Sequence, residues 1–327
     1  MKLARSIKVA GVVCAGALTL AACGGSNNET STESSPAEGG GTSGSVRVDG
    51  SSTVAPLTSA AAEIFKETNP DINVTVATSG TGGGFEKFCR GETDMSDASR
   101  PIEDDEAANC KEAGIEFQEM VVANDAMTVV VSTENDWAQC LTVEQLNKIW
   151  EPKSDVNNWN QVDPSFPDEP LKLFGPGTDS GTFDYFTDAI NGEEGASRTD
   201  YTPSEDDNVI VTGVSGSKGG LGYFGYTYFE ENQDKVKAVQ IDNGNGCVSP
   251  SPETVQDGTY TPLGRPLFIY PSIQALGSNP AFASFLTYYV ENDAEIAEAA
   301  LFIPLNEEQV STLNTQLADA KSAAGLS

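Results

Sequence analysis

The stretch SVRVDGSSTVAPLTSAAAEIFKETNPDINVTVATSG, residues 45–80, decides the fold class. Its first six residues predict a short strand that ends in a glycine turn. APLTSAAAEIFKET then has apolar residues at helical spacing, and Asn69-Pro70 predicts the end of that helix. The β-branched residues from Ile72 to Val76 alternate along a second strand. A strand, a helix and a strand in this order indicate an α/β protein.

The same alternation continues through the rest of the chain, so we expect α/β structure throughout. Residues 94–101 are expected to form a compact polar segment. Further helices are expected at 85–91, 141–150, 183–191 and 281–292, and near the C-terminus. Further strands are expected in EFQEMVVAND, AMTVVVS and LKLFG, at 209–214 and at 222–229.

Composition limits what the protein does. The chain has 327 residues, enough for about two domains. Its 49 Asp and Glu outnumber 18 Lys and Arg, for a net charge of −31, which argues against nucleic acid as a partner. There is no histidine, so Ser-His-Asp catalysis, Cys-His catalysis and His-ligated metal sites are excluded. We therefore expect no metal and no catalytic residue.

The N-terminus resembles that of a bacterial lipoprotein. Basic residues precede an apolar run, residues 9–20, which is too short to span a bilayer. The run ends in Leu-Ala-Ala-Cys23, a pattern similar to the lipobox, whose cysteine is acylated and becomes the first mature residue. We expect a signal peptide at 1–22, and the lipidated Cys23 with a flexible Gly/Ser/Thr/Glu linker at 23–44. An ordinary secretory peptide with an incidental cysteine is the alternative.

Four cysteines remain in the predicted folded part. An even number in an exported protein favours two disulfides, and three connectivities are possible. We prefer Cys89–Cys110, which brackets one short unit, and Cys140–Cys247, which would lie within another domain. No CxxC spacing supports a metal site.

Three loops contain the candidate ligand-binding residues. In each, a strand enters a cluster of Ser, Thr and Gly that opens a helix, at residues 50–53, 79–83 and 178–182. A helix start exposes unpaired N–H groups and a partial positive charge, and hydroxyls add further donors. Ordinary N-capping explains any one loop, whereas three together favour a cage of neutral donors around a small oxyanion. None matches a dinucleotide or P-loop motif, so we expect no nucleotide cofactor.

The motifs DGSSTVAPL, SGTGGGFEKFCRGETDMSDASRPI, LTVEQLNKIWEP, GPGTDSGTFDYF and GYFGYTYF resemble the phosphate-binding lipoproteins of phosphate-specific ABC transporters. This resemblance implies a type II periplasmic-binding-protein fold, in which two α/β domains are joined by two crossover strands around a ligand cleft. Domain I would comprise 45–124 and 263–327, and domain II 125–262. It also implies inorganic phosphate and permease subunits as partners, a monomer, and a lipid anchor on the extracytoplasmic face of the cell membrane.

The resemblance also implies a ligand set. Asp97 would be the carboxylate acceptor, and we expect it to favour protonated phosphate over sulfate. At Pro176 some family members have an arginine, and Arg100 is the preferred replacement, with a surface ion pair as its alternative role. The expected phosphate-binding residues are Ser52, Thr53, Val54, Thr81, Asp97, Arg100, Ser180, Gly181 and Thr182.

Three alternative functions remain open. A cage of neutral donors also suits other tetrahedral oxyanions, such as sulfate, arsenate or molybdate. A secreted phosphohydrolase is disfavoured by the absence of histidine and of an acidic cluster for two metals. A surface adhesin would use the same loops only as helix caps. The acidic runs at 104–106 and 205–207 lack a calcium-loop pattern and are interpreted as solvated faces.

Overall fold

The computed structural model describes residues 42–178 and 180–326. The predicted signal peptide, Cys23 and residues 24–41 of the predicted linker lie outside these described residues. No helix in the described part is both long enough and apolar enough to cross a membrane.

Most strands of the described residues join one nine-stranded sheet. Its order is β2-β1-β3-β12-β4-β8-β6-β7, with β9 also paired to β4, and β11-β10-β5 form a separate three-stranded sheet. The strands are β1 (Gly44–Gly50), β2 (Ile72–Thr78), β3 (Met95–Ala98), β4 (Met120–Ser132), β5 (Cys140–Thr142), β6 (Lys172–Gly175), β7 (Thr202–Pro203), β8 (Gly220–Gly225), β9 (Val236–Ala238), β10 (Gln240–Asp242), β11 (Cys247–Val248) and β12 (Gly264–Pro271).

Helices alternate with these strands and account for most of the remaining described structure. They are α1 (Ala55–Thr68), α2 (Gly80–Cys89), α3 (Asp104–Glu112), α4 (Val143–Trp150), α5 (Trp159–Val162), α6 (Gly181–Asn191), α7 (Asp207–Ser215), α8 (Tyr226–Glu230), α9 (Pro252–Gln256), α10 (Ile273–Ser278), α11 (Pro280–Glu291), α12 (Asp293–Ala299) and α13 (Glu307–Ala323).

Two large hydrophobic cores divide the described residues. The first core is built by β1, α1, α11 and α13, and includes Phe65 and Phe285. The second core is built by α4, α6, α7 and β8, and includes Trp150 and Phe186. A smaller cluster lies under α2 and α3 and includes Phe88. The chain therefore folds around two main centres, as an α/β protein of two domains requires.

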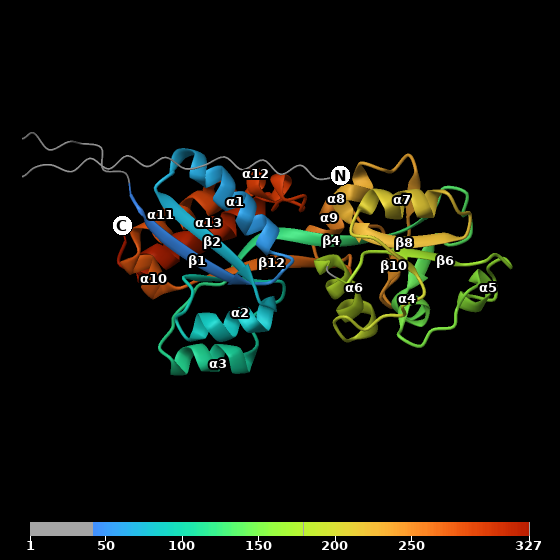
Figure 1. Cartoon of the computed structure of the whole chain (residues 1–327), viewed down its shortest axis with the longest axis horizontal. Coiled ribbons are helices and arrows are strands. Elements are labelled where there is room, and N and C mark those ends of the chain that lie inside the picture. Colours follow the sequence, from blue (N-terminus) through green and yellow to red (C-terminus); the bar gives the residue numbers. More distant parts are fainter. Residues whose placement is uncertain (1–41, 179, 327) are drawn as a thin grey trace, which may run out of the picture. The chain divides into compact units, whose positions relative to one another are not determined.

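Two antiparallel strands connect the cores, and Figure 1 shows β4 and β12 running beside each other. On β4, Met120 to Ala123 pack into the first core and Ala126 to Val131 into the second. On β12, Leu267 and Ile269 belong to the first core, and Leu263, just before the strand, belongs to the second. The predicted α/β fold with two crossover strands is confirmed.

Two elements of the first-core half differ from the sequence prediction. α2 begins at Gly80, five residues earlier than expected, because its glycines are helical. A Cβ on Gly84 would lie 2.5 Å from the Cα of Gly50, so the glycine run lets this helix pack closely on β1. Residues 95–98, expected in a compact polar segment, form the fully buried strand β3 between β1 and β12.

Three elements near the second core also differ. The two strands expected from EFQEMVVAND and AMTVVVS are one continuous strand, β4. Residues 209–214, expected as a strand, lie in helix α7, whose start is capped by Asp206. Ile210, Val211 and Val214 are buried there at helical spacing, so tertiary packing overrides their β-branched preference. The strand expected at 222–229 ends at Gly225, where α8 follows.

Both preferred disulfide pairs occur in the structure. Cys89 and Cys110 join α2 to α3, with their Cα atoms 4.2 Å apart. Cys140 and Cys247 join β5 to β11, with their Cα atoms 6.0 Å apart. Each bond therefore fastens peripheral elements within one half of the molecule.

Candidate functional site

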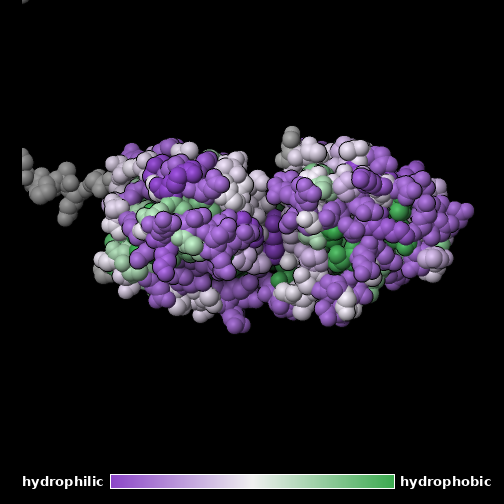
Figure 2. Space-filling view, turned by 90° about the horizontal axis from the view of Figure 1, so that it is seen from below, coloured by the Kyte–Doolittle hydropathy of each residue, from purple (hydrophilic) through white to green (hydrophobic). Residues whose placement is uncertain are grey.

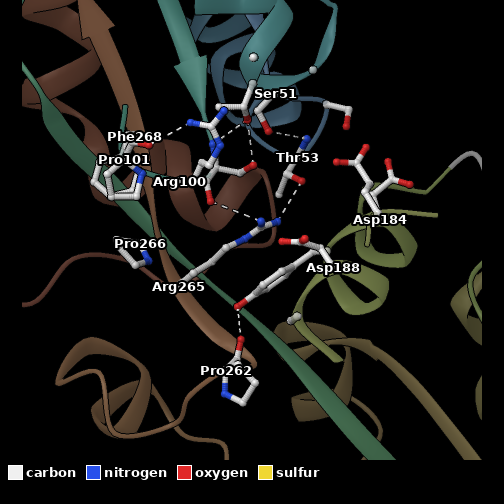
Figure 3. A pocket seen from close by; sticks show the side chains of 18 of the residues that line it. Ser51, Thr53, Arg100, Pro101, Asp184, Asp188, Pro262, Arg265, Pro266 and Phe268 are labelled. Atoms are coloured by element: carbon white, nitrogen blue, oxygen red, sulfur yellow. Dashed lines mark hydrogen bonds between the residues drawn. The ribbon is translucent and has the colours of Figure 1, made fainter. Parts of the chain in front are cut away.

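A cleft of about 650 Å³ lies between residues that belong to the two halves (Figure 3). The first-core wall consists of Ser51–Thr53, before α1, and Ser79–Gly83, at the start of α2. The second-core wall consists of Asp184, Tyr185 and Asp188 on α6. Arg265, on the connecting strand β12, lies between the two walls.

The two helix starts on the first-core wall carry hydrogen-bond donors. Neither α1 nor α2 has a side-chain cap among the described residues, and neither has an acidic residue in its first turn. At α2, the Ser79 hydroxyl instead donates to Asp49 at 2.7 Å, and Asp49 also pairs with Lys87. At α1, Thr53 N–H donates to the Ser51 hydroxyl at 3.2 Å. Uncapped helix starts present N–H groups and a positive dipole end, which suit an anion.

Arg265 supplies a guanidinium that the sequence reasoning missed. Its Nη2 donates to the Thr53 hydroxyl at 3.1 Å, and its Nη1 donates to the Ser99 carbonyl at 3.3 Å. The guanidinium carbon lies 3.4 Å from the centre of the Tyr185 ring. Figure 3 shows this side chain extending toward Thr53. A guanidinium beside two uncapped helix starts is well suited to hold a tetrahedral oxyanion.

Arg100, the predicted replacement for the arginine absent at Pro176, also lines the cleft. Its two terminal nitrogens donate to Glu106 at 2.9 Å each, and its Nε lies 3.4 Å from Glu103. The hydrogen bonds that Arg100 donates to Glu106 raise the pKa of Arg100 and stabilise its charged form. Arg100 therefore makes the ion pair named as its alternative role, while its side chain also lines the cleft.

Asp97 is fully buried, and it is outside the described lining of the cleft. Its Oδ1 accepts a hydrogen bond from Thr58 at 3.0 Å, whereas its Oδ2 has no partner among the described residues. Burial raises the pKa of the Asp97 carboxyl to about 8, although the Thr58 hydrogen bond opposes the shift. Burial thus favours the protonated form of this carboxyl, whereas the sequence analysis expected an ionised acceptor.

The third predicted loop contacts the first one directly. The Ser180 hydroxyl caps α6 by accepting from Thr182 N–H at 3.2 Å. A Cβ on Gly181 would lie 3.0 Å from the Thr53 hydroxyl oxygen, so the starts of α6 and α1 touch. Thr182 lines a separate cavity of about 160 Å³ with Asp125 and Asp207. Ser180, Gly181 and Thr182 are thus next to the cleft but outside its described lining.

The remaining predicted residues lie at the first-core wall. Ser52, Thr53 and Thr81 line the cleft, and the Thr81 hydroxyl is 3.1 Å from the Ser99 hydroxyl. The side chain of Val54 is buried in the first core, and Val54 immediately precedes α1. The structure therefore gathers the first two predicted loops around the cleft and adds Arg265 to them.

Acidic residues dominate the opposite wall. Asp184 and Asp188 line the cleft from α6, and Glu194 lies beside them. Burial, together with Glu194, raises the pKa of Asp184, and Arg265 opposes this shift.

Within residues 42–178 and 180–326, no group of three or more potential ligand side chains is arranged to hold a metal ion.

Comparisons with known proteins match this architecture. A family model described as a PBP superfamily domain matches residues 35–293. The chain is 48% identical to the protein SphX of Synechocystis over 82% of this chain and 80% of that protein. It is 38% identical to the phosphate-binding protein PstS of Staphylococcus saprophyticus over 92% of this chain and 91% of that protein.

A solved structure, described as a possible phosphate binding protein from Planctomyces limnophilus, is 49% identical and superposes with a TM-score of 0.82. The superposition covers 85% of this chain and 99% of the chain in that solved structure. Together, fold and cleft define a binding protein of the type II periplasmic class, with two α/β domains joined by two crossover strands. The chain belongs to the PBP superfamily and, within it, to the family of phosphate-binding proteins that includes PstS and SphX.

Proposed function

We propose that this protein captures inorganic phosphate in the cleft and delivers it to the permease of an ABC transporter for import. The observation that carries the proposal is the meeting of two uncapped helix starts, those of α1 and α2, with the guanidinium of Arg265. These groups offer N–H, hydroxyl and charge-assisted donors to one small anion. The named relatives add independent support.

In the proposed complex, the anion lies against Ser52, Thr53, Val54 and Thr81 on the first-core wall and accepts hydrogen bonds from Arg265. Because Gly181 packs against Thr53, an anion at the start of α1 also lies beside the start of α6. The N–H and hydroxyl groups of Ser180, Gly181 and Thr182 then contact it from the other half. Arg100 and Asp97 are not in this set, because one is held by Glu106 and the other is buried behind the wall.

The domain boundaries belong to this proposal as well. We assign 45–124 and 263–327 to domain I and 125–262 to domain II, which fits the division of the first and second cores. An anion held by both walls stabilises the closed arrangement, because it contacts both domains only there. Small-angle scattering should show compaction when phosphate is added. Identical curves with and without saturating phosphate would count against domain closure.

The cellular setting is inferred from the N-terminal sequence. We assign 1–22 to a signal peptide and Cys23 to lipidation, so that a monomer is held at the extracytoplasmic face of the cell membrane by the linker. Cys23→Ala should then release the protein from the membrane fraction, whereas the exposed-site variant Asp234→Asn should not. Retention of Cys23→Ala in the membrane fraction would contradict lipid anchoring.

Titration calorimetry of the full chain tests the function. We expect phosphate to bind and to raise the thermal unfolding midpoint. Tighter binding of sulfate, arsenate or molybdate would identify another oxyanion as the ligand. We propose that the protein is not an enzyme, and release of phosphate from a phosphate ester by the purified protein would contradict this. Absence of any anion effect would reject the binding function itself.

A further inference from the structure

Asp125 and Arg265 form a charged pair on the two connecting strands. They are direct partners in the β4–β12 ladder, between the pairs Asn124↔Pro266 and Ala126↔Gly264. The Nε of Arg265 donates to the Asp125 carboxylate at 3.3 Å. Both side chains are largely buried, with 16% of Arg265 and 13% of Asp125 exposed. The pair sits where both strands pass from one core to the other.

The two residues face different spaces. Arg265 lines the 650 Å³ cleft, where its terminal nitrogens contact Thr53 and the Ser99 carbonyl. Asp125 lines the 160 Å³ cavity, together with Thr182 and Asp207. Asp125 is therefore not placed to touch an anion in the cleft. It contacts the Nε edge of the guanidinium and leaves the two terminal nitrogens directed at the first-core wall.

An aromatic ring and further acidic groups surround the Asp125–Arg265 pair. The Tyr185 ring lies under the guanidinium, and its hydroxyl donates to the Pro262 carbonyl at 2.7 Å. Asp207 is another acidic group near Asp125, across the small cavity. Asp184 and Asp188, on α6, line the cleft with the guanidinium. Burial raises the pKa of Asp125, and the charge of Arg265 opposes that shift. Thr53 contacts the guanidinium from one half and Tyr185 from the other, while the guanidinium itself stays on the connecting strand.

We propose that Asp125 is a positioning residue that sets the charge selectivity of the anion site: it orients Arg265 and offsets one unit of its charge. This inference rests on the proposed function, since it concerns the same site. Because the pair is fixed in the ladder of the connecting strands, its charge balance is the same before and after the two domains close. A site with a nearly neutral pair distinguishes weakly between an anion with one charge and an anion with two.

The expected effect follows from Coulomb's law. The Asp125 charge repels a dianion twice as strongly as a monoanion at the same place. Removing that charge therefore strengthens dianion binding more than monoanion binding, and the difference equals the repulsion between Asp125 and a single negative charge. For largely buried charges roughly 10 Å apart and an effective dielectric constant of about 20, this corresponds to about a tenfold change in the affinity ratio. Asp125→Asn keeps the shape of the side chain and an oxygen that accepts from Arg265, and it removes the charge.

The experiment compares sulfate with phosphate at one mildly acidic pH, below the second ionisation of phosphate. There sulfate is a dianion and phosphate a monoanion, while every protein group has the same protonation for both titrations. In the full chain, Asp125→Asn should raise the affinity for sulfate relative to phosphate by about tenfold. Asp125→Glu, which restores the charge, should return the ratio toward that of the wild type. The matched control Asp234→Asn removes an exposed acid and should leave the ratio unchanged.

Two results would overturn the inference. One is an unchanged ratio in Asp125→Asn, whether or not both affinities fall together, because that is what a merely structural role produces. The other needs no variant and decides the question if Asp125→Asn does not fold: at the same mildly acidic pH, wild-type affinities for sulfate and phosphate should differ by less than about tenfold. A wild-type preference of about tenfold or more for the dianion would contradict a neutralised pair. If the wild type binds neither anion, the proposed function fails instead.

Discussion

The two walls of the cleft are built from similar helix starts but have opposite character. On the first-core wall, α1 and α2 begin without side-chain caps in the described residues and without first-turn acids. On the second-core wall, α6 begins with a Ser180 cap and carries Asp184 in its first turn. The comparison shows that an internal acceptor alone does not separate the walls, because Thr53 N–H and Thr182 N–H each donate to a serine hydroxyl two residues earlier. The first-turn acid of α6 is the feature that distinguishes its start from those of α1 and α2.

The contrast also explains how an acidic protein accommodates an anion. The chain carries a net charge of −31, and Figure 2 shows a mostly hydrophilic face with scattered apolar patches. Surface charge is screened within about 8 Å at physiological ionic strength. Binding therefore depends on the local balance among Arg265, two uncapped helix starts and the acids of α6, rather than on the total charge.

The largest expected effect lies behind the first-core wall, at Asp97. Its carboxyl has a pKa of about 8 in the folded protein, against 3.8 when unfolded. Between these values the folded state holds a proton that the unfolded state has lost, so the free energy of unfolding falls as pH rises. The slope approaches about 1.4 kcal/mol per pH unit. Asp97→Asn should flatten this dependence in urea denaturation measured over that pH range, whereas Asp234→Asn should not. Equal slopes in the wild type and Asp97→Asn would contradict the protonated state.

The two disulfides offer a second comparison between the halves. Cys140 and Cys247 are separated by 107 residues, and Cys89 and Cys110 by 21. In the chain-entropy model, closing a loop of about 100 residues stabilises by about 4.7 kcal/mol, and one of about 15 residues by about 3 kcal/mol. Replacing both cysteines of each pair by alanine should therefore destabilise the second-core half more. Denaturation that shows a larger loss for the Cys89–Cys110 variant would reverse this ranking.

The next effect separates the two cleft arginines. Arg265→Gln should weaken phosphate binding by about a hundredfold, because a charge-assisted donor to the anion is lost. Arg100→Gln is the matched control and should weaken binding by less than about threefold, because Glu106 already holds that side chain. Calorimetric titration of both variants distinguishes them. If Arg100→Gln has the larger effect, the predicted role of Arg100 as the ligand is restored.

The smallest effect concerns the contact between the walls. A Cβ on Gly181 would lie 3.0 Å from the Thr53 hydroxyl oxygen, so Gly181→Ala should push the start of α6 away from α1. We expect phosphate affinity to fall by about tenfold, equivalent to about 1.4 kcal/mol. Gly225→Ala is the control, because its Cβ would meet nothing within 4 Å. Unchanged binding in Gly181→Ala would show that the anion does not require this close approach.

Local patterns in the sequence predicted some helices and strands and missed the others. The predicted ones are α1, α2, α4, α6, α11 and α13, and β1, β2, β4, β6 and β8. The helix at Ala55–Thr68 was predictable because its apolar spacing and its Asn-Pro ending agree. The buried strand β3 was not, because Met-Ser-Asp-Ala lacks the continuous apolar run that marks a strand buried on both faces. Helix α7 was missed because Val-Ile-Val suits a strand, and only packing against the second core selects the helix.

The first-core wall was predictable because its donors are consecutive in the sequence, as in Ser52-Thr53. Arg265 was not, because the pairing of β4 with β12 brings it to the cleft from more than 200 residues beyond Thr53. One signal was available in retrospect: Asp125 and Arg265 are charged residues beside long apolar runs. Such residues in connecting strands need a partner when they are buried.

A crystal structure of the full chain with bound phosphate tests the central claim most directly. The account predicts a tetrahedral anion in the cleft that accepts hydrogen bonds from Thr53 and the Arg265 guanidinium, with Gly181 at its other side. Arg100 should remain paired with Glu106 and make no contact with the anion. Phosphate held by Arg100, or bound outside the cleft with Arg265 still attached to Thr53, would contradict the account.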